Sequence, residues 1–301
     1  NSPYAKVADL VSVAALGDEV VALGVAHGGA HANPRWTVWA GSPQRLDEYP
    51  QTFETFGGQS AGGLLDIVIT SDGPALAGSW AAREGGLDAA VWLRRGQKWL
   101  RRESTGSALA NTKEIQVAPR AASAAGSTMI ISGSVITFGN GVEQRAAVWT
   151  WPTRNSAWLL QQLPDAGTRS EALSSRCGQT CWVAGHADGT VALWSFDPAH
   201  VTGAATRDST LPSMEIDTDG PGPITVLSSD RPGILFSHAG NTHLLVSDSH
   251  NGWQAFTAPA GSVLDATTSA DKAAAKRAFE AMMTMGKIDV ATIEAAVKGE
   301  N

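Results

Sequence analysis

A strand-like pattern recurs through this chain at an almost constant interval. Short apolar runs end at Gly24, Gly78, Gly133 and Gly185, and the run GILFSH reaches the equivalent position at His238. The successive steps are 54, 55, 52 and 53 residues. Repetition at a fixed period indicates that the chain folds as a repeat protein, in which each unit buries its apolar faces against its neighbours.

Each unit has the content of four short β-strands. An apolar run and a turn precede the glycine-ending strand, as LLDIVITSDG precedes PALAG. The strand that follows carries an aligned residue in every unit: Trp39, Trp92, Trp149, Trp194 and, in the fifth, Val246. A return strand holds a second tryptophan in three units, at Trp99, Trp158 and Trp253. Four strands in roughly fifty residues are typical of a propeller blade, so we predict an all-β fold, a β-propeller of five or six four-stranded blades in residues 1–270.

The repeat pattern ends near residue 270. A sixth unit starts at Ser262, where SVLDATTSADK matches LLDIVITSDG, but no glycine-ending strand follows it. Phe279, Met282 and Ile293 instead fall at helical spacings. We therefore predict that residues 271–301 form a short helical tail or fused segment.

Charge and hydropathy argue against two kinds of partner. The chain has 22 Lys and Arg against 29 Asp and Glu, a net charge of −7, so no basic field for nucleic acid is expected. No run of 18 apolar residues occurs, so no transmembrane segment is expected. The first residues, NSPYAKVADL, lack the layout of a signal peptide. Neither a phosphate loop nor a complete metal-ligand set is found, so we predict no cofactor and no metal.

The two cysteines are Cys177 and Cys181, in RCGQTCWVAG. A disulfide fits this spacing if the chain reverses at Gly178–Gln179, and free thiols or a metal site are the alternatives. A disulfide implies an oxidising compartment, so we expect an extracytoplasmic protein, either secreted or associated with the cell envelope.

Tryptophans and arginines supply the candidate binding residues. Most tryptophans are interpreted as core packing between blades, while Trp80 and Trp151 are candidates for stacking on a sugar. Arg94, Arg95 and Arg101 lie in a basic hairpin with Lys98 and Arg102. This hairpin is either a solvated surface or a docking patch for an acidic protein or polysaccharide.

Three further groups of residues match only part of a known kind of site. His27 and His31 stand four residues apart, but in the glycine-rich segment HGGAHANP. Glu215, Asp217, Asp219 and Gly220 match half of a calcium loop, whose twelfth position is Val226 instead of glutamate. His238, His243 and His250 lie near Asp248 and two serines, Ser237 and Ser247, without a nucleophile elbow. His238 is kept as a binding candidate, because it replaces the repeated glycine and can point into a central channel.

The repeat resembles the sialidase-like (BNR-type) propellers of bacterial secreted proteins. The resemblance rests on Ala89–Trp92 with Gly96 and Trp99, and on Ala146–Trp149 with Trp158. It implies a propeller over roughly residues 7–270. Sialidase activity is not implied, because that chemistry needs a tyrosine and glutamate pair, and Tyr4 and Tyr49 lie in no matching motif.

The tail resembles a different family. The phrase AMMTMGKIDVATIEAA is similar to the helical end of glyoxalase-like (vicinal-oxygen-chelate) proteins. The metal-binding strands of that family are absent from the sequence, so the resemblance implies no glyoxalase chemistry and fits a fused or engineered segment.

These observations favour a non-catalytic extracytoplasmic propeller that acts as a binding or scaffold module for a protein or glycan. The alternative is a glycan-acting hydrolase or lyase with its site over the central channel, and a third interpretation makes the tail a helical docking peptide. A pair of carboxylates converging at the channel mouth would favour the enzyme.

Overall fold

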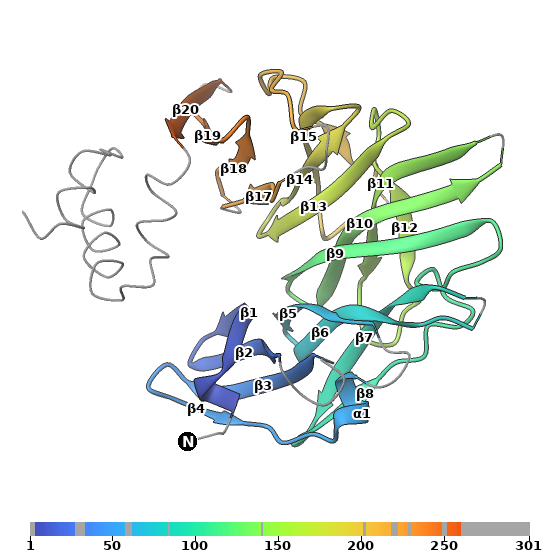
Figure 1. The fold of residues 1–301 in the computed structure, drawn as a ribbon, viewed down its shortest axis with the longest axis vertical. Helices are drawn as coiled ribbons and strands as arrows, with labels where there is room; N and C mark the ends of the chain where they lie inside the picture. Colours follow the sequence, from blue (N-terminus) through green and yellow to red (C-terminus); the bar gives the residue numbers. More distant parts are fainter. Residues whose placement is uncertain are drawn as a thin grey trace, which may run out of the picture.

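The computed structural model describes residues 4–27, 34–57, 62–83, 85–139, 141–200, 203–217, 222–227, 230–248 and 252–259. These residues form five antiparallel sheets of four strands, and the strands of each sheet follow one another in chain order. Figure 1 shows the five sheets arranged around a common centre. The protein is therefore a β-propeller, as the repeat predicts, and we name its blades A to E in chain order.

The strands have the following bounds. Blade A holds β1 (Ala8–Leu16), β2 (Glu19–Ala26), β3 (Arg35–Ser42) and β4 (Arg45–Glu48). Blade B holds β5 (Leu64–Thr70), β6 (Gly73–Ala81), β7 (Leu87–Arg95) and β8 (Lys98–Arg101). Blade C holds β9 (Ile115–Ala125), β10 (Thr128–Phe138), β11 (Val142–Trp151) and β12 (Leu159–Gln162). Blade D holds β13 (Ser170–Cys177), β14 (Cys181–Ala187), β15 (Thr190–Phe196) and β16 (Thr206–Arg207). Blade E holds β17 (Thr225–Val226), β18 (Gly233–His238), β19 (Asn241–Ser247) and β20 (Trp253–Pro259).

Two short helices complete the described part of the chain. A 3-10 turn, η1 (Tyr4–Lys6), precedes blade A, and α1 (Phe53–Phe56) lies in the linker to blade B. Phe56 is buried there, edge-on to Trp92 with 6.4 Å between ring centroids. None of the described helices is long and apolar enough to cross a membrane. The predicted sixth unit from Ser262 and the predicted tail at 271–301 lie outside the described residues.

The repeated glycines are required by a backbone irregularity that recurs in four blades. The pairing of the first two strands shifts register after Leu10 in blade A and after Leu64 in blade B, and blades C and D have the same shift. Gly78, Gly133 and Gly185 lie opposite it, where an added Cβ would overlap the carbonyl oxygen of the bulged strand. Only glycine leaves room for so close an approach of two strands.

The repeated tryptophans form hydrogen bonds that join a blade to the linker preceding it. Trp92, Trp149 and Trp194 have no exposed surface. Their Nε1 groups donate to the carbonyls of Thr55 (2.7 Å), Ala108 (2.8 Å) and Pro164 (2.8 Å), respectively, each of which lies in the preceding linker. Trp39 occupies the same register position in blade A, but its buried Nε1 has no partner among the described residues. The core interpretation of these tryptophans therefore agrees with the structure.

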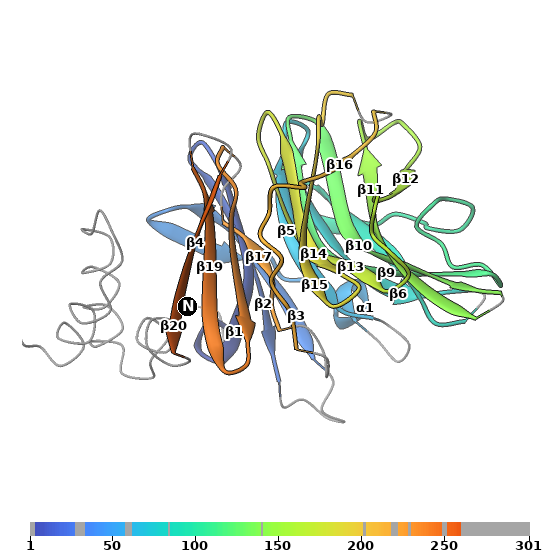
Figure 2. The ribbon, with the colours of Figure 1, turned by 90° about the horizontal axis from the view of Figure 1, so that it is seen from above.

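The strand order sorts the loops onto two faces of the propeller. In a sheet of four consecutive antiparallel strands, the turns between strands one and two and between strands three and four share one end. The linkers between blades lie at the other end. Figure 2 gives the side view, in which strands of neighbouring blades run in broadly the same direction. We call the first end the hairpin-turn face and the second the linker face.

The predicted disulfide is present on the hairpin-turn face. Cys177 and Cys181 are bonded and pair directly across the end of the β13–β14 hairpin. Cys181 is fully buried between blades C and D. The bond therefore closes the turn between β13 and β14.

Candidate functional site

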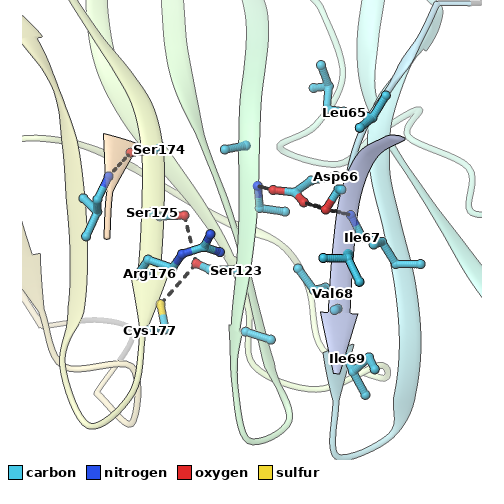
Figure 3. A pocket seen from close by; sticks show the side chains of 18 of the residues that line it. Leu65, Asp66, Ile67, Val68, Ile69, Ser123, Ser174, Ser175, Arg176 and Cys177 are labelled. Carbon is cyan, nitrogen blue, oxygen red and sulfur yellow. Dashed lines mark hydrogen bonds between the residues drawn. The ribbon is translucent and has the colours of Figure 1, made fainter. Parts of the chain in front are cut away.

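The innermost strands of all five blades line a central channel of about 750 Å³. Its wall is formed by β1, β5, β9, β13 and the short β17. Small residues such as Ala14, Ala121 and Ala122 leave this space open. Figure 3 shows Asp66 and Arg176 among the side chains that line it. They are the two charged residues among the described residues of the wall.

The Asp66 carboxylate joins three blades across this channel. Its Oδ1 accepts hydrogen bonds from the Ser12 hydroxyl of blade A and from its neighbour's amide, Ile67 N, at 2.9 Å. Its Oδ2 accepts from Ala122 N of blade C, also at 2.9 Å (Figure 3). Burial raises the pKa of Asp66, while these hydrogen bonds and the positive charge of Arg176 act in the opposite direction. The carboxylate therefore holds the wall together.

Hydroxyl groups continue the polar lining on the other side of the channel. The Ser123 and Ser175 hydroxyls lie 2.8 Å apart and link blades C and D, and Ser123 Oγ is also 3.2 Å from Cys177 Sγ. Ser174 Oγ accepts from Val226 N at 2.8 Å and links blades D and E. The channel thus offers hydroxyls, one guanidinium and one engaged carboxylate, which is a set suited to holding a polar molecule.

A second recess lies between blades D and E on the hairpin-turn face. It has a volume of about 500 Å³ and combines two partly exposed tryptophans, Trp182 and Trp253, with acidic side chains. The acidic residues are Asp208, Asp230 and Asp248, and Arg231 lies beside them. Indole rings offer apolar faces and carboxylates accept hydrogen bonds from hydroxyls, and together these groups can hold a sugar ring. We call this recess the D–E cleft.

Local hydrogen bonds fix the geometry of the D–E cleft. Asp208 Oδ1 accepts from the backbone amide and the hydroxyl of Thr210, at 2.8 and 2.6 Å. Trp253 Nε1 lies 3.2 Å from the same hydroxyl. Asp248 Oδ1 accepts from Gly252 N at 2.8 Å. The indole of Trp253 is therefore held against the blade D linker by a side chain that an aspartate orients.

A third recess lies between blades B and C on the same face. It measures about 360 Å³ and is lined by three arginines and one aspartate, together with Leu93 and Asn155. The charged residues are Asp72, Arg95, Arg102 and Arg154. We call it the B–C cleft.

The structure divides the predicted basic hairpin. Arg94 is ion-paired with Glu19 of blade A and lies over the Tyr49 ring, 5.8 Å from its centroid. Arg101 stacks over Trp80, with 4.9 Å to the ring centroid. Arg95 is exposed and enters the B–C cleft. Of the three, Arg95 lines the B–C cleft, and their predicted role in docking stays a prediction.

The two predicted sugar-stacking tryptophans differ in accessibility. Trp80 is partly exposed, and its neighbours are Arg101 and the edge of Trp92. Trp151 is only 3% exposed and stacks on Trp158 with 5.2 Å between centroids. Trp151 therefore presents no open ring face, whereas a prediction of stacking at Trp80 still stands.

The histidine candidates lie away from the channel wall. His238 Nδ1 is 3.0 Å from Asp217 Oδ1, and His238 is not among the residues that line the channel. His243 stacks on Phe236 and its Nδ1 lies 3.1 Å from Thr257 Oγ1. In the described part of the chain, these two histidines therefore contact Asp217, Phe236 and Thr257, and the structure gives them no hydrogen bond to a serine. His250 lies outside the described residues.

The metal candidates are only partly described. His27 is exposed, while His31, Asp219 and Gly220 lie outside the described residues. Over the part of the chain that the structure describes, no group of three His, Cys, Asp or Glu side chains could hold a metal ion.

The sequence predicts Arg95 and Arg102 as part of the basic hairpin, but it does not single out the other residues of the two clefts. Trp253 follows the repeat and is interpreted as core packing, and Trp182 and Arg154 belong to no repeated motif. The signal that could have found them is position: each lies near a turn between strands one and two or between strands three and four. Asp66 was missed because an isolated aspartate in an apolar strand carries no motif.

Comparison with known proteins places the fold in a wide structural class. No family model matches the chain, and no curated protein matches it in sequence. A solved structure of SapL1 lectin in complex with alpha methyl fucoside is 11% identical over 84% of this chain and 80% of its own, with a TM-score of 0.50. AofleA from Arthrobotrys oligospora is 10% identical over 84% of this chain and 70% of its own, also with a TM-score of 0.50.

A third solved structure is an enzyme. Hadza microbial sialidase Hz136 is 8% identical over 83% of this chain, with a TM-score of 0.53, and this chain spans 57% of its length. At such identities the likeness shows the fold alone. This chain is a β-propeller whose fold is similar to those of a lectin and a sialidase.

Proposed function

We propose that this protein is a non-catalytic propeller that binds carbohydrate through the D–E cleft on its hairpin-turn face. The observation that carries the proposal is the composition of the channel, because the described wall holds one carboxylate, Asp66. Glycoside hydrolysis normally uses two carboxylates that flank the scissile bond. Asp66 is also occupied by three donors from three blades.

The D–E cleft supports carbohydrate as the ligand. Partly exposed tryptophans beside hydrogen-bonding carboxylates match the amphipathic surface of a sugar, whose C–H faces are apolar and whose hydroxyls need acceptors. Its volume of about 500 Å³ is that of a small-molecule site. The similarity to a lectin solved with alpha methyl fucoside is compatible with this ligand class.

The proposal extends to location. A disulfide at Cys177–Cys181 persists in an oxidising compartment, so the protein would act outside the cytoplasm. A protein partner remains the other ligand class under the same binding role, and the loops of the hairpin-turn face would carry it.

The test is a glycan array, followed by calorimetry with the sugar that gives the strongest signal. Trp253→Ala should weaken that binding about tenfold or more, because a stacked aromatic and its hydrogen bond are lost. Trp36→Ala, which removes a partly buried tryptophan of blade A outside both clefts, serves as the matched control and should bind normally. Equal losses in both variants would contradict the site.

The rival enzymatic function is tested on the same protein. A panel of glycosidase and polysaccharide lyase substrates should give no turnover. Turnover that disappears in Asp66→Asn, with an unchanged thermal melt, would overturn the non-catalytic proposal.

A further inference from the structure

The B–C cleft brings together arginines from separate parts of two blades. Arg95 ends β7, and Arg102 follows β8 directly. Arg154 lies in the loop between β11 and β12, and Asp72 in the turn between β5 and β6. The three guanidinium groups and a single carboxylate therefore meet at the seam between neighbouring blades.

These three arginines lack the ion pairs that other arginines of the protein make. Arg45, Arg94, Arg101, Arg120 and Arg145 each pair with an aspartate or glutamate. Within the described residues no ion pair involves the three arginines of the B–C cleft. On a chain whose net charge is −7, the cleft is thus a local excess of positive charge, with three guanidinium groups against the one carboxylate of Asp72.

One N–H group of Arg154 is a buried hydrogen-bond donor that lacks an acceptor among the described residues. Its Nη2 is buried and has no hydrogen-bond partner among the described residues. The group lies against the backbone of Gly73, 3.5 Å from where a Cβ would stand. Burial lowers the pKa of Arg154, Asp72 opposes this, and the positive charges of Arg95 and Arg94 lower it further. A buried donor without an acceptor is costly, and an anion that reaches Nη2 would remove that cost.

Arg102 is held in place by an aromatic stack. Its guanidinium lies over the Trp151 ring, 5.6 Å from the centroid, and Trp151 stacks in turn on Trp158. Stacking of this kind leaves the N–H groups at the edge of the guanidinium free to donate within its plane. A planar donor edge is suited to the oxygens of a carboxylate or sulfate.

We propose that the B–C cleft binds the carboxylate or sulfate group of an acidic saccharide. Its volume of about 360 Å³ lies at the small end of small-molecule sites, which suits one charged sugar unit. Arg95, Arg102 and Arg154 donate to the anion, and Asp72 limits how tightly it is held. This site is separate from the D–E cleft and does not require that cleft to bind sugar.

The experiment is calorimetry with three defined probes on the intact protein. Trigalacturonate carries carboxylates, a heparin-derived disaccharide carries sulfates, and maltotriose is the neutral probe. At least one acidic probe should bind, and the neutral probe should not. The probe that binds more tightly identifies which anionic group the site prefers.

Substitutions then locate the binding. Arg95→Gln and Arg154→Gln should each weaken the acidic probe about tenfold or more, because a charge-assisted hydrogen bond is lost. Arg45→Gln makes the same change of charge on blade A, at a side chain that is 79% exposed, and should leave the affinity unchanged. Asp72→Asn should strengthen binding. Since Arg95 is exposed, its variant remains informative if Arg154→Gln lowers the melting temperature.

Three results would overturn the proposal. The first is equal weakening by Arg45→Gln and Arg95→Gln, because this would mean that the whole surface and not the cleft attracts the probe. The second is equal binding of maltotriose. The third is an acidic peptide that binds more tightly than either saccharide and is lost in the same two variants. Because the Trp253→Ala test uses a different cleft, either proposal can fail without the other.

Discussion

At the scale of single residues, a few polar side chains link the innermost strands of neighbouring blades. Asp66 links blades A, B and C, the Ser123–Ser175 pair links blades C and D, and Ser174 links blades D and E. Each of these groups sits on an innermost strand, and the described innermost strands of neighbouring blades belong to separate sheets. Side-chain hydrogen bonds therefore supply the contacts that a sheet ladder supplies within a blade.

Asp66 should give the protein an unusual dependence on pH. Burial raises its pKa in the folded state above the unfolded value, so the folded protein binds the proton more readily. Stability contributed by this residue is therefore lost as pH rises through the folded pKa, and is regained as pH falls toward about 4. We expect the unfolding free energy of the wild type, minus that of Asp66→Asn, to increase as pH is lowered over this range.

Urea denaturation of both proteins at several pH values measures this difference. The subtraction removes the titration of all other carboxylates, which the two proteins share. A difference that shrinks on acidification would mean that the hydrogen bonds to the ionised carboxylate outweigh its burial.

At the scale of the strand, the same bulge and the same glycine recur in four blades. The bulge changes the direction of the first strand. The glycine opposite it leaves room for a backbone carbonyl to come close. In blade E the strand pairing puts Phe236 at this position, since Thr225 pairs with Leu235 as Ser174 pairs with Ala184, and not His238, which the sequence period predicts. The described pairing of β17 covers only Thr225 and Val226. The glycine is therefore absent where the described pairing has no bulge for it to accommodate.

Replacing a bulge glycine should destabilise its blade. Gly185→Ala places a Cβ against the carbonyl oxygen of Glu171, so one strand must move, and we expect a loss of about 1–3 kcal/mol in unfolding free energy. Gly139→Ala is the control, because nothing lies within 4 Å of its added Cβ. Chemical denaturation should separate the two variants, and equal stability would show that the bulge relaxes freely.

The repeated tryptophan offers a second internal comparison. Trp92→Phe replaces the indole by a smaller phenyl ring and removes the hydrogen bond to the Thr55 carbonyl. Trp39→Phe makes the same change of ring, but the Nε1 that it removes has no described partner. We expect Trp92→Phe to cost about 1 kcal/mol more than Trp39→Phe in unfolding free energy. An equal cost would indicate that Trp39 donates to a carbonyl outside the described residues, as the other blades do to their linkers.

At the scale of the whole molecule, the apolar seams between blades hold the ring together. Four clusters of buried side chains fill the A–B, B–C, C–D and D–E seams. The innermost strand of blade A differs, since Leu10 is 74% and Val13 66% exposed on β1. Stability is thus expected to come from contacts between neighbouring blades, as in other repeat proteins.

The segment after residue 270 should be dispensable for this assembly, because its sequence lacks the strand pattern of the blades. A chain ending at Asp271 should keep the β-type circular dichroism and the cooperative melt of the full chain. Aggregation of the shortened chain, or a much lower melting temperature, would mean that the segment is an integral part of the ring.

The sequence alone determined the blades and the order of the strands within each blade. Strand alternation, turn residues and the spacing of Gly78 and Trp92 are local signals, because pairing within a blade joins strands that are adjacent in the chain. The Cys177–Cys181 bond was predictable for the same reason, since both residues belong to one hairpin.

Only the tertiary structure decided where ligands can bind. Arg95 and Arg154 meet because of how blade C is seated against blade B, and Trp182 and Trp253 meet because of how blade E is seated against blade D. That seating depends on side-chain packing in the seams, which no local period encodes. The repeat period therefore specifies the strands of each blade, but it does not specify which side chains of one blade face those of the next. For this reason a recess between two blades cannot be predicted from the repeats alone.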